Sequence, residues 1–227
     1  MKITWLGQAG LLFETDEACV IIDPYLSDSC AAINPASARR VPVNEDFLKI
    51  TPDFLIFTHN HRDHYDPDTA EIYLAMQEKI TVLAPESVWG IARQKKGPHN
   101  YVQFDRHTTW TDKGLRFTAV KATHSDPAAI GVLIEELSSG KIYYVTGDTL
   151  YNSEIFADLP QNIEAVFLPV NGAGNNMNMT DAAAFAAKTG AKYAVPLHVG
   201  LMDDKNAEGF ACPNRVIPAF YKEIRLG

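Results

Sequence analysis

A metal-binding pattern is present in the stretch His59-Asn60-His61-Arg62-Asp63-His64, where three imidazoles and a carboxylate lie within six residues. On a short loop, His59 and His61 can face one point. Asp63 and His64 can then face a neighbouring point. Neutral imidazole and carboxylate together suit zinc, manganese or iron. A single histidine in a polar loop is usually a solvated side chain, but three at this spacing favour a metal site.

Three more polar side chains follow apolar stretches that have the character of strands. They are His124, Asp148 and His198. Side chains at such positions leave the core and enter a cleft, and the ends of adjacent strands lie close together. We therefore expect these three to join the first group. His99 and His107, the other two of the seven histidines, lie in polar segments and are expected at the surface.

Short apolar segments broken by turns predict many strands, with helices after some of them. No linker or low-complexity stretch divides the chain, which favours one layered α/β domain over residues 1–227. The polar, proline-containing segment 27–44 is expected to be a long loop. Strands are predicted at residues 3–6, 11–14, 19–22, 53–58, 81–84, 115–121, 130–136, 142–146, 165–170 and 193–197. Helices are predicted from Pro67, after Pro85, at 180–188 and, with an internal Pro218, at 214–224.

The composition is that of an acidic globular protein. Of 227 residues, 20 are Lys or Arg and 28 are Asp or Glu, so the formal net charge is -8. A hydrophobic content of 46% excludes disorder. No apolar run approaches the ~20 residues that span a bilayer, and the first residues do not resemble a signal peptide. Cys19, Cys30 and Cys212 are widely spaced, so we expect reduced thiols and a cytoplasmic location.

The seven metal-ligand candidates, in this order and spacing, resemble the metallo-β-lactamase superfamily. The resemblance covers most of the chain, from Leu6-Gly7 to His198. It implies an α/β fold, a four-layer αββα sandwich, with two divalent metal ions at one edge of its sheets. One ion would be bound by His59, His61 and His124 and the other by Asp63, His64 and His198, with Asp148 bridging both.

Within that superfamily the chain is most similar to the L-ascorbate-6-phosphate lactonase-like branch. This implies a dinuclear hydrolase that uses a metal-bridging hydroxide on a small anionic ester or lactone, such as a sugar-phosphate lactone. The ions would be zinc, as is commonest in the superfamily, or manganese, as the branch suggests. Asp63 and Asp148 would be the catalytic carboxylates. The similarity rests on Thr4-Trp5-Leu6-Gly7, Asp23-Pro24, His124-Ser125-Asp126-Pro127, Thr146-Gly147-Asp148-Thr149 and Leu168-Pro169-Val170-Asn171-Gly172.

Two alternatives to a lactonase remain open. A phosphodiesterase of the same fold would act on a nucleic acid or a phospholipid. The net charge of -8 and the lack of a basic arm or basic amphipathic helix argue against nucleic acid and membrane as partners. A protein that only binds metal is the other alternative, but such degeneration normally removes ligands and none of the seven is missing. The resemblance also permits a homo-oligomer.

Candidate substrate-binding residues are fewer. Arg39 and Arg40, in the long loop, can clamp a phosphate or carboxylate, or they can be solvated surface arginines. Asn171 can place an amide at the cleft, or it can stabilise the Asn-Gly turn that it begins. The nearest candidates to hydrogen-bond the ligand imidazoles are Thr58, Thr123 and Asp126.

Overall fold

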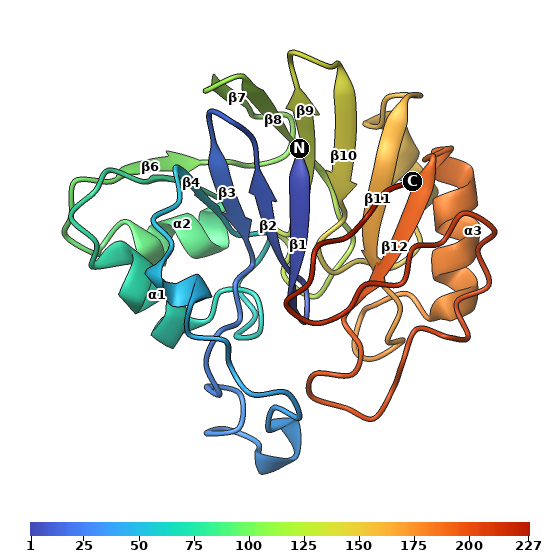
Figure 1. The fold of residues 1–227 in the computed structure, drawn as a ribbon, viewed down its shortest axis with the longest axis horizontal. Helices are drawn as coiled ribbons and strands as arrows, with labels where there is room; N and C mark the ends of the chain where they lie inside the picture. Colours follow the sequence, from blue (N-terminus) through green and yellow to red (C-terminus); the bar gives the residue numbers. More distant parts are fainter.

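Two six-stranded β-sheets pack face to face in the computed structural model, which describes residues 1–227 (Figure 1). In each sheet the strands joined by short turns are antiparallel, and those joined through longer crossover connections are parallel. The first sheet has the order β1 (Lys2–Gly7), β2 (Gly10–Glu14), β3 (Cys19–Ile22), β4 (Phe54–Ile56), β5 (Thr81–Ala84) and β6 (Asn100–Gln103). The second has the order β12 (Tyr193–Leu197), β11 (Ile163–Pro169), β10 (Lys141–Val145), β9 (Ile130–Glu136), β8 (Leu115–Lys121) and β7 (Thr109–Asp112).

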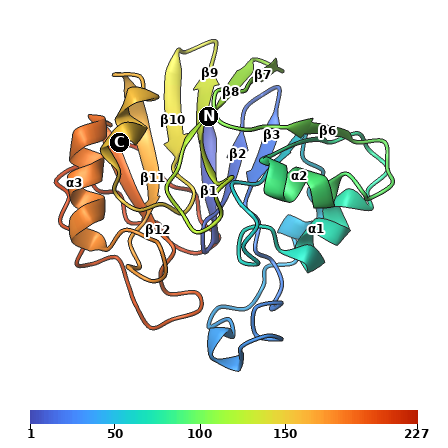
Figure 2. The same cartoon turned by 180° about the vertical axis from the view of Figure 1, so that it is seen from behind.

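Helices cover the outer face of each sheet. The first sheet carries α1 (Pro67–Leu74) and α2 (Glu86–Ala92), and the second carries α3 (Met179–Thr189) (Figures 1 and 2). Local chemistry sets the limits of α3, because the Asn178 side chain accepts the N–H of Thr180 and Gly190 ends the helix at φ 68°. No helix is both long and apolar enough to cross a membrane. The short 3-10 helices are η1 (Pro35–Ser37), η2 (Phe47–Lys49) and η3 (Ser153–Ala157).

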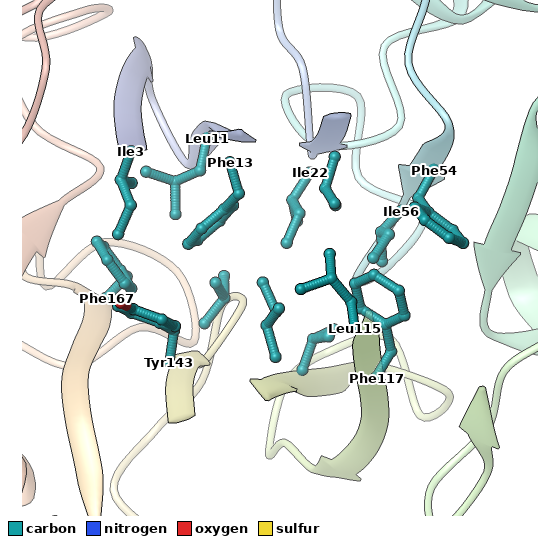
Figure 3. Close-up of a cluster of buried hydrophobic side chains, with 14 of the residues drawn as sticks. Ile3, Leu11, Phe13, Ile22, Phe54, Ile56, Leu115, Phe117, Tyr143 and Phe167 are labelled. Carbon is teal, nitrogen blue, oxygen red and sulfur yellow. The ribbon is translucent and has the colours of Figure 1, made fainter. Parts of the chain in front are cut away.

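The largest apolar cluster fills the space between the sheets. Figure 3 shows Phe13 of the first sheet facing Tyr143 and Phe167 of the second, and the Phe13 and Phe167 rings meet edge to face at 5.7 Å. Separate clusters lie under α1 and α2 and under α3. The four-layer αββα sandwich predicted from the sequence is therefore confirmed.

The helix predicted at 214–224 is wrong. This segment runs as turns and single bridges, with the N–H of Ile224 donating to Ile3 O at 2.8 Å and that of Val216 donating to Ala194 O at 2.9 Å. Pro218 cannot continue a helix, and the free edges of β1 and β12 offer backbone partners instead. The segment therefore covers one edge of each sheet, as the dark red chain in Figure 1 shows.

Other differences from the sequence-based expectations lie at the opposite sheet edges. β6 and β7 are not among the predicted strands, because each is a short, polar edge strand without an apolar pattern.

His107 is exposed as expected, but His99 is half-buried. The N–H of Ile80 donates to His99 Nδ1 at 3.2 Å, and His99 Nε2 donates to Leu74 O at 3.1 Å, so this imidazole links α1 to the start of β5. The three cysteines are free thiols, as expected.

Asp158 ties η3 to the second sheet. Its carboxylate accepts Nε and Nη2 of Arg106 at 2.7 and 2.8 Å and the N–H of Lys121 at 2.9 Å. The Asp158 side chain is only 6% exposed, whereas the Arg106 side chain is 41% exposed. Hydrogen bonding to Arg106 holds the pKa of Asp158 well below its usual range, against a smaller opposing effect of burial.

We predict that Asp158→Ala lowers the free energy of unfolding by about 2 kcal/mol at pH 7. The matched control Asp46→Ala, which breaks an exposed pair with Lys49, should cost far less because solvent screens that pair. A lowered pKa stabilises the fold above the unfolded value near ~3.9, so the difference between wild type and Asp158→Ala should shrink as pH falls below that value. Urea unfolding at several pH values measures the free energy of unfolding. An equal loss of this free energy in Asp158→Ala and Asp46→Ala would contradict the prediction.

Candidate metal centre

The seven predicted ligands come together at one end of the sandwich. His59 follows β4, and His61, Asp63 and His64 lie on the same loop. His124 follows β8, Asp148 follows β10 and His198 directly follows β12, and all three strands belong to the second sheet. The site therefore needs both sheets, since each supplies ligands from loops at the ends of its strands.

Two unusual backbone conformations bring the sheet ends together. Gly147, at φ 59°, lets the end of β10 approach the histidine loop, because a Cβ atom there would lie 2.8 Å from Ile130 O and 2.9 Å from Thr58 Cβ. His198 has φ 66°, a left-handed conformation that costs a non-glycine residue energy. Its N–H donates to Gln8 O at 3.0 Å, and this bond fixes the ligand beside the turn between β1 and β2.

The donor atoms form two adjacent groups that Asp148 connects. His64 Nε2 lies 3.3 Å from Asp148 Oδ1, and His198 Nε2 lies 3.3 Å from Asp148 Oδ2. His124 Nε2 lies 3.9 Å from Asp148 Oδ2. Within each group the potential ligand atoms all lie within 4.8 Å of one another. The first group is His59, His61, His124 and Asp148, and the second is Asp63, His64 and His198.

Two buried polar atoms of the cluster have no hydrogen-bond partner in the protein. They are His59 Nε2 and Asp148 Oδ1. Because nearly all buried polar atoms in folded proteins are satisfied, these two indicate a ligand other than the protein itself. Imidazole nitrogen and carboxylate oxygen at this spacing are ligands for divalent transition-metal ions. The residues present therefore fit a metal centre built from a His/Asp cluster.

The charges of the cluster compensate one another. Burial lowers the pKa of His59 well below its ordinary value, which keeps this imidazole in the neutral form that binds metal. Burial also opposes a charge on His198, but the carboxylates of Asp148 and Asp63 outweigh it and raise the pKa of His198 to about 10. Burial by itself would raise the pKa of Asp148, but His198 and His64 outweigh this effect and hold that pKa well below its usual range.

Asp23 holds two of the predicted ligands, His64 directly and His59 through Thr58. Its Oδ2 lies 2.8 Å from His64 Nδ1 and accepts Thr58 Oγ1 at 2.5 Å, and its Oδ1 accepts the Thr58 N–H at 2.8 Å. Thr58 Oγ1 in turn lies 3.1 Å from His59 Nδ1. The hydroxyl donates to Asp23, so it accepts from His59. Both imidazoles thus carry their proton on Nδ1 and present Nε2 to the centre.

Only some of these supporting contacts are expected from the sequence. Thr58 does contact a ligand, and Asp126 accepts the N–H of Asn60 at 3.0 Å, which holds the histidine loop. Thr123 Oγ1 instead accepts Asn152 Nδ2 at 3.0 Å and makes no hydrogen bond to a predicted ligand. Asp23 is absent from the predicted supporting residues, although its place at a strand end before Pro24 is a usable signal.

A cavity of about 470 Å³ opens onto the cluster. Most of its 14 lining residues are of polar type, and only Ala173 and Met202 are hydrophobic. The loop after β11 forms part of the wall and reaches the ligands. In this loop Asn175 O accepts His124 Nδ1 at 3.0 Å, and Asn176 Nδ2 donates to Asp148 Oδ2 at 2.8 Å.

The predicted substrate-binding residues lie in different places. Asn171 lines the cavity, but neither arginine does. Arg39 donates to Tyr25 O at 2.7 Å and to Tyr221 Oη at 2.6 Å, so its guanidinium holds the long loop to the body of the protein. Arg40 donates to Asp204 Oδ1 at 2.7 Å at the surface. Binding of substrate by the arginine pair stays a prediction.

Comparison with known proteins places this arrangement in a family context. A profile described as Beta-lactamase superfamily domain matches residues 19–199. This matched region contains all seven predicted ligands. A protein of Ligilactobacillus salivarius (strain UCC118), named UPF0173 metal-dependent hydrolase, is 31% identical over 206 residues, which is 87% of this chain and 84% of that protein.

Solved structures share the fold at lower identity. The isothiocyanate hydrolase from Delia radicum gut bacteria aligns over 100% of both chains, with a TM-score of 0.73 and 20% identity. CmlA, a diiron beta-hydroxylase from Streptomyces venezuelae, aligns over 99% of this chain and 54% of its own, with a TM-score of 0.77 and 15% identity. At these identities the two structures establish the common fold.

We predict that Asp23→Asn weakens metal binding by about 10–100-fold, because the amide cannot accept from both His64 and Thr58 as the carboxylate does. Competition between metal-free protein and a chromophoric chelator for Zn²⁺ measures the change. Asp16→Asn, the same substitution at an exposed carboxylate, is the control and should leave the affinity as in wild type. Equal affinities for wild type and Asp23→Asn would show that the carboxylate does not support the ligands.

Proposed function

This chain belongs to the beta-lactamase superfamily, and on that premise we propose that it is a dinuclear metal-dependent hydrolase of a small anionic ester or lactone. The observation that carries the proposal is the His/Asp cluster, whose two groups of donors share Asp148 at the floor of a cavity. Zinc and manganese both suit its ligands.

We assign the two donor groups to two ions. His59, His61 and His124 would hold one, and Asp63, His64 and His198 the other, with Asp148 between them. When bound, the ions would supply a hydroxide nucleophile at neutral pH and polarise the oxygen of the scissile group.

The protein's own part is to hold the substrate and move protons. Asp63 lines the cavity, and its Oδ2 accepts Gln8 Nε2 at 2.8 Å. This bond holds the carboxylate in place beside the centre. Asp63 is therefore the carboxylate that we propose accepts the proton of the attacking water.

The shape and chemistry of the cavity support a small, polar substrate. Its volume of about 470 Å³ suits a metabolite rather than a polymer. Asn171, Asn175, Asn176 and Ser125 supply amide and hydroxyl groups along the wall, which suit a substrate with several hydroxyl groups. A sugar-phosphate lactone has this character, in agreement with the branch resemblance seen in the sequence.

Two cations near the cluster support an anionic substrate, although neither side chain lines the cavity. Arg62 lies between His61 and Asp63 in the chain, and its exposed side chain has no ion-pair partner. Lys205 donates to Asn171 O at the cavity wall. Neither cation is neutralised by a carboxylate, so both can compensate part of the charge of a phosphate or carboxylate substituent.

We predict that the protein loaded with Zn²⁺ or Mn²⁺ opens phosphorylated sugar lactones and that Asp148→Ala lowers kcat by at least about a hundredfold. The variant should also lose about one metal equivalent in elemental analysis, because its carboxylate would bridge both ions. A panel of lactones together with bis-p-nitrophenyl phosphate tests the substrate class. Activity on the diester alone would favour a phosphodiesterase, and two bound metals without turnover on any substrate would contradict the hydrolase.

A second prediction concerns the charge of the substrate. Arg62→Gln should raise KM for anionic lactones roughly fivefold, the size of effect that a solvent-screened ion pair gives, and leave KM for neutral lactones unchanged. Arg225→Gln removes an exposed arginine near the C-terminus and serves as the matched control. Equal effects of Arg62→Gln on anionic and neutral substrates would exclude Arg62 as an anion-binding residue.

A further inference from the structure

The ligand His198 lies between two side-chain amides. Its Nδ1 is 3.0 Å from Asn171 Nδ2. Gln8 Nε2 lies close to both ring nitrogens, 3.0 Å from Nδ1 and 3.2 Å from Nε2. Gln8 occupies the turn between β1 and β2, and Asn171 lies two residues after Pro169, the last residue of β11. The other ring nitrogen, Nε2, faces the centre, at 3.2 Å from Asp63 Oδ2. Nδ1 is therefore the atom through which the protein can orient this imidazole.

Metal binding constrains the partner of Nδ1. A neutral histidine that binds a cation through Nε2 carries its proton on Nδ1, so Nδ1 becomes a donor. An amide nitrogen is also only a donor. With two amide nitrogens facing it, the Nδ1–H group would have no acceptor, so one of the two amides must present its oxygen instead.

The contacts of the two amides identify which one presents its oxygen to Nδ1. Gln8 Nε2 also donates to Asp63 Oδ2 at 2.8 Å, and exchange of its ends would place oxygen against a carboxylate. Asn171 Nδ2 makes no bond other than the one to His198, and Asn171 Oδ1 is buried without any partner. The nitrogen and oxygen of an amide have nearly the same shape, so a half-turn of this side chain puts Oδ1 where Nδ2 now lies.

We propose that Asn171 is the positioning residue of His198: its Oδ1 accepts the Nδ1–H and thereby directs Nε2 to the metal. The proposal rests on the two-metal site proposed above. An asparagine side chain that presents Oδ1 accepts from a protonated Nδ1. The backbone of Asn171 is held by a bridge to Asn178 and by Lys205 Nζ, so the side chain can turn while its anchor stays fixed.

The test is a pair of substitutions that separate acceptor from donor. Asn171→Asp keeps two oxygen acceptors, and Asn171→Leu keeps the approximate volume but no polar atom. Zn²⁺ is titrated into metal-free protein against a chromophoric chelator. Asn171→Leu should bind the more weakly held ion about 10–100-fold less tightly, and Asn171→Asp at least as tightly as wild type. Asn162→Asp adds the same charge at an exposed asparagine remote from the cluster and should leave the affinity unchanged.

A second readout separates the hydrogen bond from charge. In the Zn²⁺-loaded wild type and in Asn171→Asp, the Nδ1–H proton of His198 should be protected from exchange and visible by NMR, and it should be lost in Asn171→Leu. Loss of metal and of this signal in Asn171→Asp as well would show that Asn171 acts as a donor and would overturn the proposal. Wild-type behaviour of Asn171→Leu would also overturn it. Failure of the wild type to bind a second Zn²⁺ would instead overturn the two-metal site.

Discussion

The rest of the centre depends on the hydrogen bonds of the Asp23 carboxylate, which is fully buried. It accepts the backbone N–H and the hydroxyl of Thr58 and faces His64, so it fixes the end of β4 and two ligand imidazoles at once. A buried carboxylate is costly unless its oxygens are fully hydrogen-bonded, and here the two oxygens have three donors. The tautomers of His59 and His64 follow from that arrangement.

Closure of the centre requires that two independent sheets meet at the correct distance. The apolar cluster between them sets their separation, and Gly147 removes the one side chain that would keep the end of β10 away from Thr58. Asp148 then reaches both donor groups. His198, which follows β12, has a left-handed φ, and its N–H donates to Gln8 O in the turn between β1 and β2 of the first sheet.

The loop after β11 turns a metal-binding cluster into a shaped polar cavity. It contacts the ligands through Asn171, Asn175 and Asn176, and it also supplies much of the wall that a substrate would touch. The same loop would therefore both contact the substrate and hold the predicted metal ligands in place. The formal net charge of -8 includes Asp63 and Asp148, so two divalent ions would make the centre locally cationic and able to hold an anion.

The sequence by itself determined the layers and the ligand candidates. Short apolar segments separated by turns predicted most of the strands. His59, His61, Asp63 and His64 were recognisable because three imidazoles in six residues are rare in a solvated loop. The polar edge strands β6 and β7 and the segment 214–224 were not predictable, since their structure depends on backbone partners far along the chain. Gln8 was not predictable for the same reason, because it contacts Asp63 and His198 far along the chain. Local pattern reports which residue types are present, but only the tertiary structure decides which side chains share a hydrogen bond across two sheets.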